Sequence, residues 1–243
     1  MTTLRFSDFA NVVFFTGAGM SAESGVPTYR GRGGIWKEYD YETYACQTAF
    51  DRDPRRVWEF HNYRRGLVAG CEPNAGHRLI AQLERERPGV VVVTQNIDGL
   101  HQRAGSRNVF ELHGSLWRTR CERCGKREAS DDAPLADVHC PCGAFKRPDI
   151  VWFGDMLSSD LLRAASEAMS HADLLVAIGT SASVYPAAEL PRLAQRAGAV
   201  LVEINLEDTP LSDLYDHRLR GTASAILAEL CDAATPAPGS APH

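Results

Sequence analysis

Long apolar runs are missing from this sequence. No stretch of the 243 residues approaches the roughly 18 consecutive apolar residues that a membrane-spanning helix needs. The first ten residues, MTTLRFSDFA, also lack the apolar core of a secretion signal. We therefore expect a cytoplasmic protein that has no membrane partner.

An excess of basic charge is missing as well. The net charge is −5, and acidic and basic residues are well mixed along the chain. Such a balance gives no global basic field, so no specific nucleic-acid partner is expected. With 44% hydrophobic residues, the chain is long enough for one large α/β domain, or for a large domain and a small one.

The chain has seven cysteines, and four of them are clustered. Cys121 and Cys124 lie in CERC, and Cys140 and Cys142 lie in CPC. Two such pairs surround one tetrahedral Zn²⁺ in many small modules, and four thiolates leave the metal no open position. We expect a structural zinc ion rather than four free thiols, although the second pair is one residue tighter than usual.

Basic residues decorate the first cysteine pair. A nucleic-acid-binding ribbon and an ordinary solvated surface both explain such a cluster, and the solvated surface is the preferred interpretation. The five residues are Arg118, Arg120, Arg123, Lys126 and Arg127.

Apolar runs alternate with amphipathic segments along most of the chain. The runs at 11–15, 89–94, 173–180 and 199–205 read as buried strands, and the segments at 75–86 and 161–169 read as helices. This alternation predicts an α/β fold with a parallel sheet covered by helices on both faces.

Two stretches interrupt the alternation. Residues 31–74 read as a helical insertion, and residues 118–147 contain the clustered cysteines, after which the sheet pattern is expected to resume at 149–153. We assign 1–30, 75–117 and 148–232 to the sheet domain and the two insertions to a small domain. The Pro- and Ala-rich tail at 233–243 is expected to be disordered.

Polar residues and glycines follow several of the predicted strands. Gly17 and Gly19 come directly after the first, where they suit either a phosphate contact or a tight strand-to-helix turn. The stretch at 179–181 follows another strand, and Asn205 ends a fourth. Because the carboxyl ends of parallel strands meet in one crevice, these residues together suggest a dinucleotide site.

The valine run at 90–93 ends in the most polar of these clusters. Gln95, Asn96 and Asp98 follow it, and they have the groups to hydrogen-bond a carboxamide. His113, in ELHG, is a candidate general base. Singly, Asn96 and Asp98 could cap a turn and His113 could be a buried structural histidine. Their joint arrival at one crevice favours a functional interpretation.

At this point the chain resembles the sirtuins, which are NAD-dependent protein-lysine deacylases, over about residues 10 to 230. The resemblance rests on GAGMSAESGVPTYR, TQNIDGLHQRAG, ELHG, the cysteine pairs, RPDIVWFGD, GTSASVYPAA and IN, in the family's order and spacing. Two departures are Thr28 and Tyr29 before Arg30, where the family has Asp-Phe-Arg, and Asp155, where it has glutamate.

The resemblance implies a Rossmann-like domain, a small domain and a peptide that enters between them. It implies that the acyl-lysine oxygen attacks the nicotinamide ribose of NAD, that nicotinamide leaves, and that the acyl group is transferred to ADP-ribose. His113, Asn96 and Asp98 would be catalytic, and acyl-lysine proteins would be the partners. The NAD contacts would be Gly17, Ala18, Gly19, Tyr29, Arg30, Gln95, Asn96, Asp98, Gly179, Thr180, Ser181 and Asn205, and the peptide contacts Val151, Phe153 and Gly154.

The preferred acyl group depends on the segment at 57–67. It resembles the sirtuin branch that removes succinyl and malonyl groups with a tyrosine and, three residues later, an arginine. Arg64 is present, but His61 replaces the tyrosine, and Arg32 stands where a small residue is common. Without the resemblance, an ordinary solvated helix would be preferred. We expect deacetylation and also desuccinylation, with a succinyl-to-acetyl rate ratio that rises as pH falls if His61 gains a proton.

Two other function classes remain open. An NAD-consuming ADP-ribosyltransferase or glycohydrolase would release nicotinamide without an acyl-peptide. A non-catalytic module would bind NAD and acyl-lysine together without turnover.

Overall fold

The computed structural model describes residues 4–28, 34–35 and 39–232. Tyr29, Arg30 and Arg32, which the sequence places near the site, lie outside these residues, as does the tail at 233–243. Within the described ranges, no helix is both long enough and apolar enough to cross a bilayer.

A six-stranded parallel sheet forms the larger part of the molecule, in the order β3-β2-β1-β7-β8-β9. The four predicted apolar strands are confirmed as β1, β2, β7 and β8. The edge strands β3 and β9 were not predicted from the sequence. The strands are β1 (Val12–Thr16), β2 (Val90–Thr94), β3 (Val109–Glu111), β7 (Leu174–Ile178), β8 (Val200–Asn205) and β9 (His217–Arg220).

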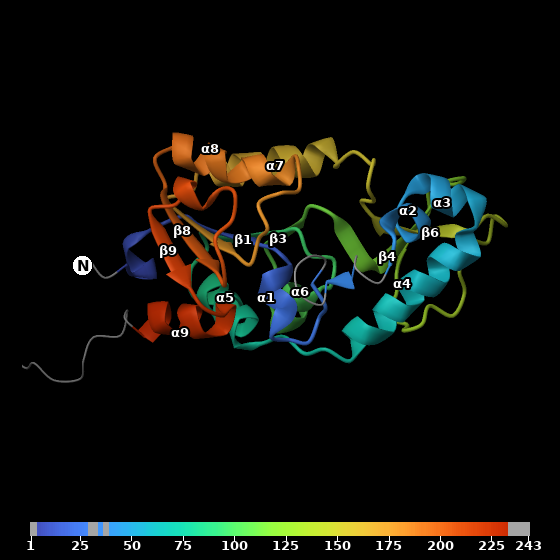
Figure 1. The fold of residues 1–243 in the computed structure, drawn as a ribbon, viewed down its shortest axis with the longest axis horizontal. Coiled ribbons are helices and arrows are strands. Elements are labelled where there is room, and N and C mark those ends of the chain that lie inside the picture. The colour runs from blue at the N-terminus through green and yellow to red at the C-terminus, as the bar shows by residue number, and fades with distance from the viewer. Residues whose placement is uncertain (1–3, 29–33, 36–38, 233–243) are drawn as a thin grey trace, which may run out of the picture.

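Helices cover both faces of this sheet (Figure 1). Alternate side chains of each strand point to opposite faces, so Phe15 packs with the core beneath α7 and α8 while Phe14 packs with the core beneath α5 and α9. The predicted helix at 75–86 is confirmed to the residue, and Asn74 caps it. The covering helices are α1 (Ala18–Ala22), α5 (Ala75–Glu86), α6 (Leu100–Ala104), α7 (Ser159–Ser170), α8 (Leu190–Arg196) and α9 (Ala223–Asp232).

A three-stranded antiparallel sheet, in the order β5-β4-β6, lies beside a group of helices at the other end of the molecule (Figure 1). Trp58 and Val57 of α4 pack in one apolar cluster with Leu116 and Ile150 of this sheet. The elements are α2 (Tyr41–Tyr44), α3 (Gln47–Arg52), α4 (Pro54–Ala69), β4 (Gly114–Cys121), β5 (Arg127–Ala129) and β6 (Lys146–Ile150). Short 3₁₀ turns occur at Phe6–Asp8, Ala187–Glu189 and Ser212–Leu214.

The expectation that the parallel sheet resumes at 149–153 is wrong. The strand there is β6, and it pairs antiparallel with β4 in the small sheet. Apolar residues alone do not say which sheet a strand joins, because either sheet buries them. The small sheet also extends past both ends of the cysteine insertion, so the domain boundaries at 117 and 148 stay predictions.

Candidate functional site

A cavity of about 780 Å³ lies between the carboxyl ends of the parallel strands and the small sheet. It collects most of the residues that the sequence singles out. The predicted residues that line it are Gly17, Ala18, Gly19, His61, Arg64, Gln95, Asn96, His113, Val151, Phe153, Gly154, Gly179, Thr180, Ser181 and Asn205. Segments far apart in the sequence therefore form one site, as expected for strand ends in a parallel sheet.

Gly17 and Gly19 serve close backbone packing. A Cβ atom on Gly17 would lie 2.7 Å from the carbonyl oxygen of Gly179, and one on Gly19 would lie 2.6 Å from the Cα atom of Gly179. Their amides donate to the carbonyls of Ile178 and Gly179. The tight-turn interpretation is therefore supported, and these two N–H groups already have partners inside the protein.

His113 stands at the wall of the cavity, just after β3. Its Nδ1 atom lies 3.0 Å from the backbone oxygen of Gln95. A carbonyl oxygen only accepts, so Nδ1 carries the proton and Nε2 is the basic nitrogen. Burial lowers the pKa of His113 below the usual 6.5, and the hydrogen bond to Gln95 offsets part of that shift. The imidazole is therefore neutral near pH 7 and suited to accept a proton.

Asn96 is held by a buried network behind the cavity wall. Its Nδ2 donates to the Gly17 oxygen at 2.9 Å and to the Ser21 hydroxyl at 3.2 Å. Ser21 in turn donates to Asp98 Oδ2 at 2.8 Å. The Nε2 atom of His77 lies 3.4 Å from the same hydroxyl, while its Nδ1 accepts from the Asn74 amide. These contacts fix the side-chain amide of Asn96 in one orientation.

Asp98 does not line the cavity. Its carboxylate accepts hydrogen bonds from Ser21 and from the Leu100 amide, and the residue is 4% exposed. Burial raises its pKa above the usual 3.8, and the two hydrogen bonds oppose this effect. The structure therefore places Asp98 outside the residues that line the cavity, where Ser21 links it by hydrogen bonds to Asn96.

The helical insertion supplies the other side of the cavity through α4. His61 and Arg64 both line it and are 2% and 4% exposed, and Arg65 is fully buried. The ordinary solvated helix is therefore ruled out for this face. Arg65 donates to the backbone oxygens of Leu116, Ser130 and Asp132, which anchors α4 to the small sheet.

His61 is a neutral histidine. Its Nε2 accepts a hydrogen bond from Trp152 Nε1 at 3.2 Å, and the two rings stack. Burial, reinforced by the charge of Arg64, lowers the pKa of His61 to about 3. The expected gain of a proton near neutral pH is therefore not supported, and Nδ1 carries the single ring proton.

Residues 151–154 form an irregular segment directly after β6. The Val151 amide donates to the His113 oxygen at 3.0 Å, and the Phe153 amide donates to the Ala45 oxygen at 3.2 Å. Gly154 has a φ of +88°, a conformation that favours glycine. The segment thus lines the cavity and connects His113 to Ala45 of the helical insertion.

The opposite end of the cavity lies at β7 and β8. Asn205 donates from Nδ2 to the Thr180 oxygen at 2.8 Å, and Ser181 Oγ lies 2.9 Å from Ser183 Oγ. Sequence reasoning missed two lining segments here, at 206–210 and 221–223. The second follows β9, whose sequence HRLR has no apolar alternation, so no pattern pointed to it.

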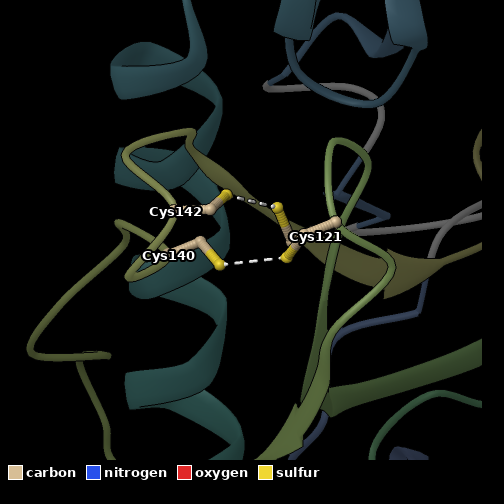
Figure 2. A group of neighbouring side chains, drawn as sticks. Cys121, Cys140 and Cys142 are labelled. Atoms are coloured by element: carbon tan, nitrogen blue, oxygen red, sulfur yellow. Dashed lines mark hydrogen bonds between the residues drawn. The ribbon is translucent and has the colours of Figure 1, made fainter.

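The four clustered cysteines meet as predicted, and Figure 2 labels three of them, Cys121, Cys140 and Cys142. Their Sγ atoms all lie within 4.8 Å of one another, with Cys121 and Cys142 at 3.5 Å and Cys124 and Cys140 at 3.5 Å. Zn–S bonds of about 2.3 Å put tetrahedral sulfurs about 3.8 Å apart. The geometry therefore fits one zinc ion, and the donor set is complete with four sulfurs.

Carboxylates lie against the basic residues around the cysteine pairs. Arg118 pairs with Glu111 at 2.5 Å, Arg120 lies 3.8 Å from Asp149, and Lys126 pairs with Glu128. Asp149 and Glu128 lie on the small sheet, and Glu111 lies on β3 of the parallel sheet. Three of the five basic residues therefore lie in a mixed-charge surface.

Known proteins resemble this chain over most of its length. A model described as the Sir2 family matches residues 17–186. An NAD-dependent protein deacylase of Aquifex aeolicus (strain VF5) is 44% identical over 225 residues, which cover 91% of this chain and 94% of that protein. A mutant Sir2 homologue in complex with ADP-ribose superposes with a TM-score of 0.90 at 41% identity, covering 94% of this chain and 93% of the other. A Sir2 homologue in complex with NAD superposes with a TM-score of 0.86 at 42% identity, covering 92% of this chain and 89% of the other.

Proposed function

The chain belongs to the Sir2 family of NAD-dependent protein deacylases, and we propose that it removes acyl groups from lysine with His113 as the general base. It consumes NAD as a co-substrate and acts on acyl-lysine proteins. The observation that carries the site assignment is the hydrogen bond from His113 Nδ1 to Gln95, which leaves Nε2 basic at the cavity wall. A proton leaving a ribose hydroxyl needs such a group.

Asn96 is assigned to the nicotinamide carboxamide. Its Nδ2 is committed to Gly17 and Ser21, so we assign its Oδ1 to the carboxamide N–H group. Asp98 acts through Ser21 and keeps Asn96 in this orientation. Gly17, Ala18, Gly19, Thr180, Ser181 and Asn205 form the remaining NAD side of the cavity, with Gln95 and Gly179.

The acyl-lysine side of the cavity is assigned to α4 and the segment at 151–154. A succinyl group carries a carboxylate, and Arg64 is a buried cation at the cavity wall. Charge-assisted hydrogen bonds from a guanidinium favour such a group. We therefore propose desuccinylation besides deacetylation, with neutral His61 donating from Nδ1 where the related branch uses tyrosine.

The clustered cysteines would hold the zinc ion as a structural element. Because four thiolates complete its coordination, the ion would stabilise the small sheet without contacting a substrate. We also propose that the protein is cytoplasmic. We propose no specific nucleic-acid partner, and the ion pairs of three basic residues around the cysteines support this second proposal.

The test is mass spectrometry of acetyl-, succinyl- and unmodified lysine peptides incubated with NAD. We expect the deacylated lysine peptide, nicotinamide and acyl-ADP-ribose from both acylated peptides, and no products from the unmodified peptide. The His113→Tyr variant should lower both rates about a hundredfold or more, with its fold verified by circular dichroism. Nicotinamide released without acyl-peptide would instead indicate a glycohydrolase or ADP-ribosyltransferase, and binding without products would indicate a non-catalytic module.

A further inference from the structure

Arg147 is a buried cation outside the residues assigned so far. It lies on β6, is 2% exposed and is among the largest fully buried side chains of the described residues. Burying a guanidinium is costly unless charged and polar partners surround it. Its partners therefore indicate which parts of the molecule it holds together.

The partners of Arg147 come from three separate segments. Nη1 donates to the side chain of Gln47 on α3, and it lies 3.2 Å from Glu122 Oε1, between the first two clustered cysteines. Nη2 donates to the carboxylate of Asp155 and, at 3.3 Å, to the Ile150 oxygen. One planar fork thus joins the helical insertion, the cysteine cluster and the segment that follows β6.

Arg147 also fixes the ring of Trp152. The guanidinium carbon lies 3.8 Å from the centre of that ring, close enough for a cation–π contact. Asp155 Oδ2 accepts from the Trp152 amide at 3.0 Å, and the Asp155 amide donates back to the Trp152 oxygen. Trp152 in turn contacts His61, because its Nε1 donates a hydrogen bond to His61 Nε2 at 3.2 Å.

We propose that Arg147 is a positioning residue for the acyl-lysine side of the cavity. It closes the turn at 152–155 through Asp155, orients Trp152, and through Trp152 orients His61. Within the described residues, none of these four side chains hydrogen-bonds Gly17, Gln95 or Asn205 on the NAD side, which the parallel sheet holds. This inference rests on the assignment of residues 151–154 and His61 to the acyl-lysine substrate.

The test compares Arg147→Met with Arg120→Met, because Arg120 is the direct cross-strand partner of Arg147 and also lies near Glu122. Calorimetric titrations should measure the Kd for an acetyl-lysine peptide and, separately, for ADP-ribose. In Arg147→Met we expect the peptide Kd to rise about tenfold and the ADP-ribose Kd to stay within about twofold. Arg120→Met should bind both ligands like the wild type, and metal analysis of each variant should give unchanged zinc.

A second variant, Asp155→Asn, keeps an acceptor for the Trp152 amide and removes only the charge that pairs with Arg147. It should weaken peptide binding in the same direction, which keeps the proposal testable if Arg147→Met does not fold. Peptide binding within about twofold of the wild type in the folded variants would overturn the proposal, and so would a parallel loss of ADP-ribose binding. Failure of the wild type to bind acetyl-peptide would refute the proposed function instead.

Discussion

The Nδ1 atom of His113 lies 3.0 Å from the backbone oxygen of Gln95, and this contact places the ring proton of the neutral imidazole on Nδ1. Gln95 directly follows β2, and His113 follows β3, the neighbouring strand of the sheet. The parallel pairing of two strands therefore brings an acceptor and a histidine together. Nε2 remains as the basic atom at the cavity, which is the arrangement that a general base requires.

The pH dependence of deacetylation should reflect the pKa of His113. Burial lowers this pKa below 6.5, so the basic form persists as pH falls through the neutral range. We expect kcat/KM for an acetyl-peptide to be constant between about pH 7 and 8 and to fall only below pH 6.5, as the imidazole gains a proton. Initial rates across this range would check it, and an acid limb centred above pH 7 would contradict it.

Replacing Cys124 with serine should remove zinc and unfold the small sheet together. Metal binding and local folding share one free energy, so loss of one thiolate weakens both. Metal analysis should show that the zinc content falls from one ion per chain to well below one, and the near-ultraviolet circular dichroism signal should decrease. The matched control is Cys46→Ser, since Cys46 lies outside the cluster. Unchanged zinc content in Cys124→Ser would show that the ligand set is wrong.

Arg64→Met should depress desuccinylation far more than deacetylation. Losing a charged hydrogen bond to a carboxylate costs about 1.5–3 kcal/mol, which corresponds to roughly a tenfold to hundredfold loss of kcat/KM. Because the acetyl group has no carboxylate, kcat/KM for deacetylation should fall much less. Arg55→Met, an exposed position on the same helix, is the control. Equal losses for both acyl groups would refute the acidic-acyl assignment.

The succinyl-to-acetyl rate ratio should not change between about pH 6 and 8. Because the pKa of His61 is lowered to about 3, its imidazole stays neutral throughout this range. The guanidinium of an arginine keeps its charge as well. Parallel rate profiles with the two peptides would check this. A ratio that rises steadily as pH falls would mean that His61 gains a proton when the acyl group is bound.

Gly179→Ala should destabilise the fold at the centre of the site. Gly179 has a φ of +60°, and a Cβ atom there would lie 2.5 Å from the backbone of Gly19. Strain and overpacking together should lower the free energy of unfolding by about 3 kcal/mol or more. Gly198 has a φ of +86°, and a Cβ atom added there would have no neighbour within 4 Å among the described residues. Gly198→Ala should therefore lower the free energy of unfolding by only about 1–2 kcal/mol. Urea unfolding of both variants would compare them, and equal losses would show that the contact with Gly19 carries no cost.

The regular parts of the fold follow from local sequence patterns. The continuous apolar run at 90–93 predicts a strand buried on both faces, and the segment at 75–86 predicts a helix because its apolar residues recur with the helical period. The edge strand β9 shows the limit of this reasoning. Its sequence HRLR leaves most side chains in solvent, so hydrogen bonding to β8 makes it a strand without any apolar alternation.

The sequence by itself determined the chemistry of the site, since the residue types of the four cysteines, His113 and Asn96 are what metal binding and proton transfer need. Only the tertiary structure decided where each group faces. Asp98 was predicted beside Asn96 at the ligand, yet Ser21 and Leu100 take its carboxylate behind the cavity wall. Arg147 begins the motif RPDIVWFGD, but nothing in the sequence indicated that its side chain joins three segments. The physical reason is that burial, tautomer and pKa depend on partners brought together from distant parts of the chain, and no local pattern records those partners.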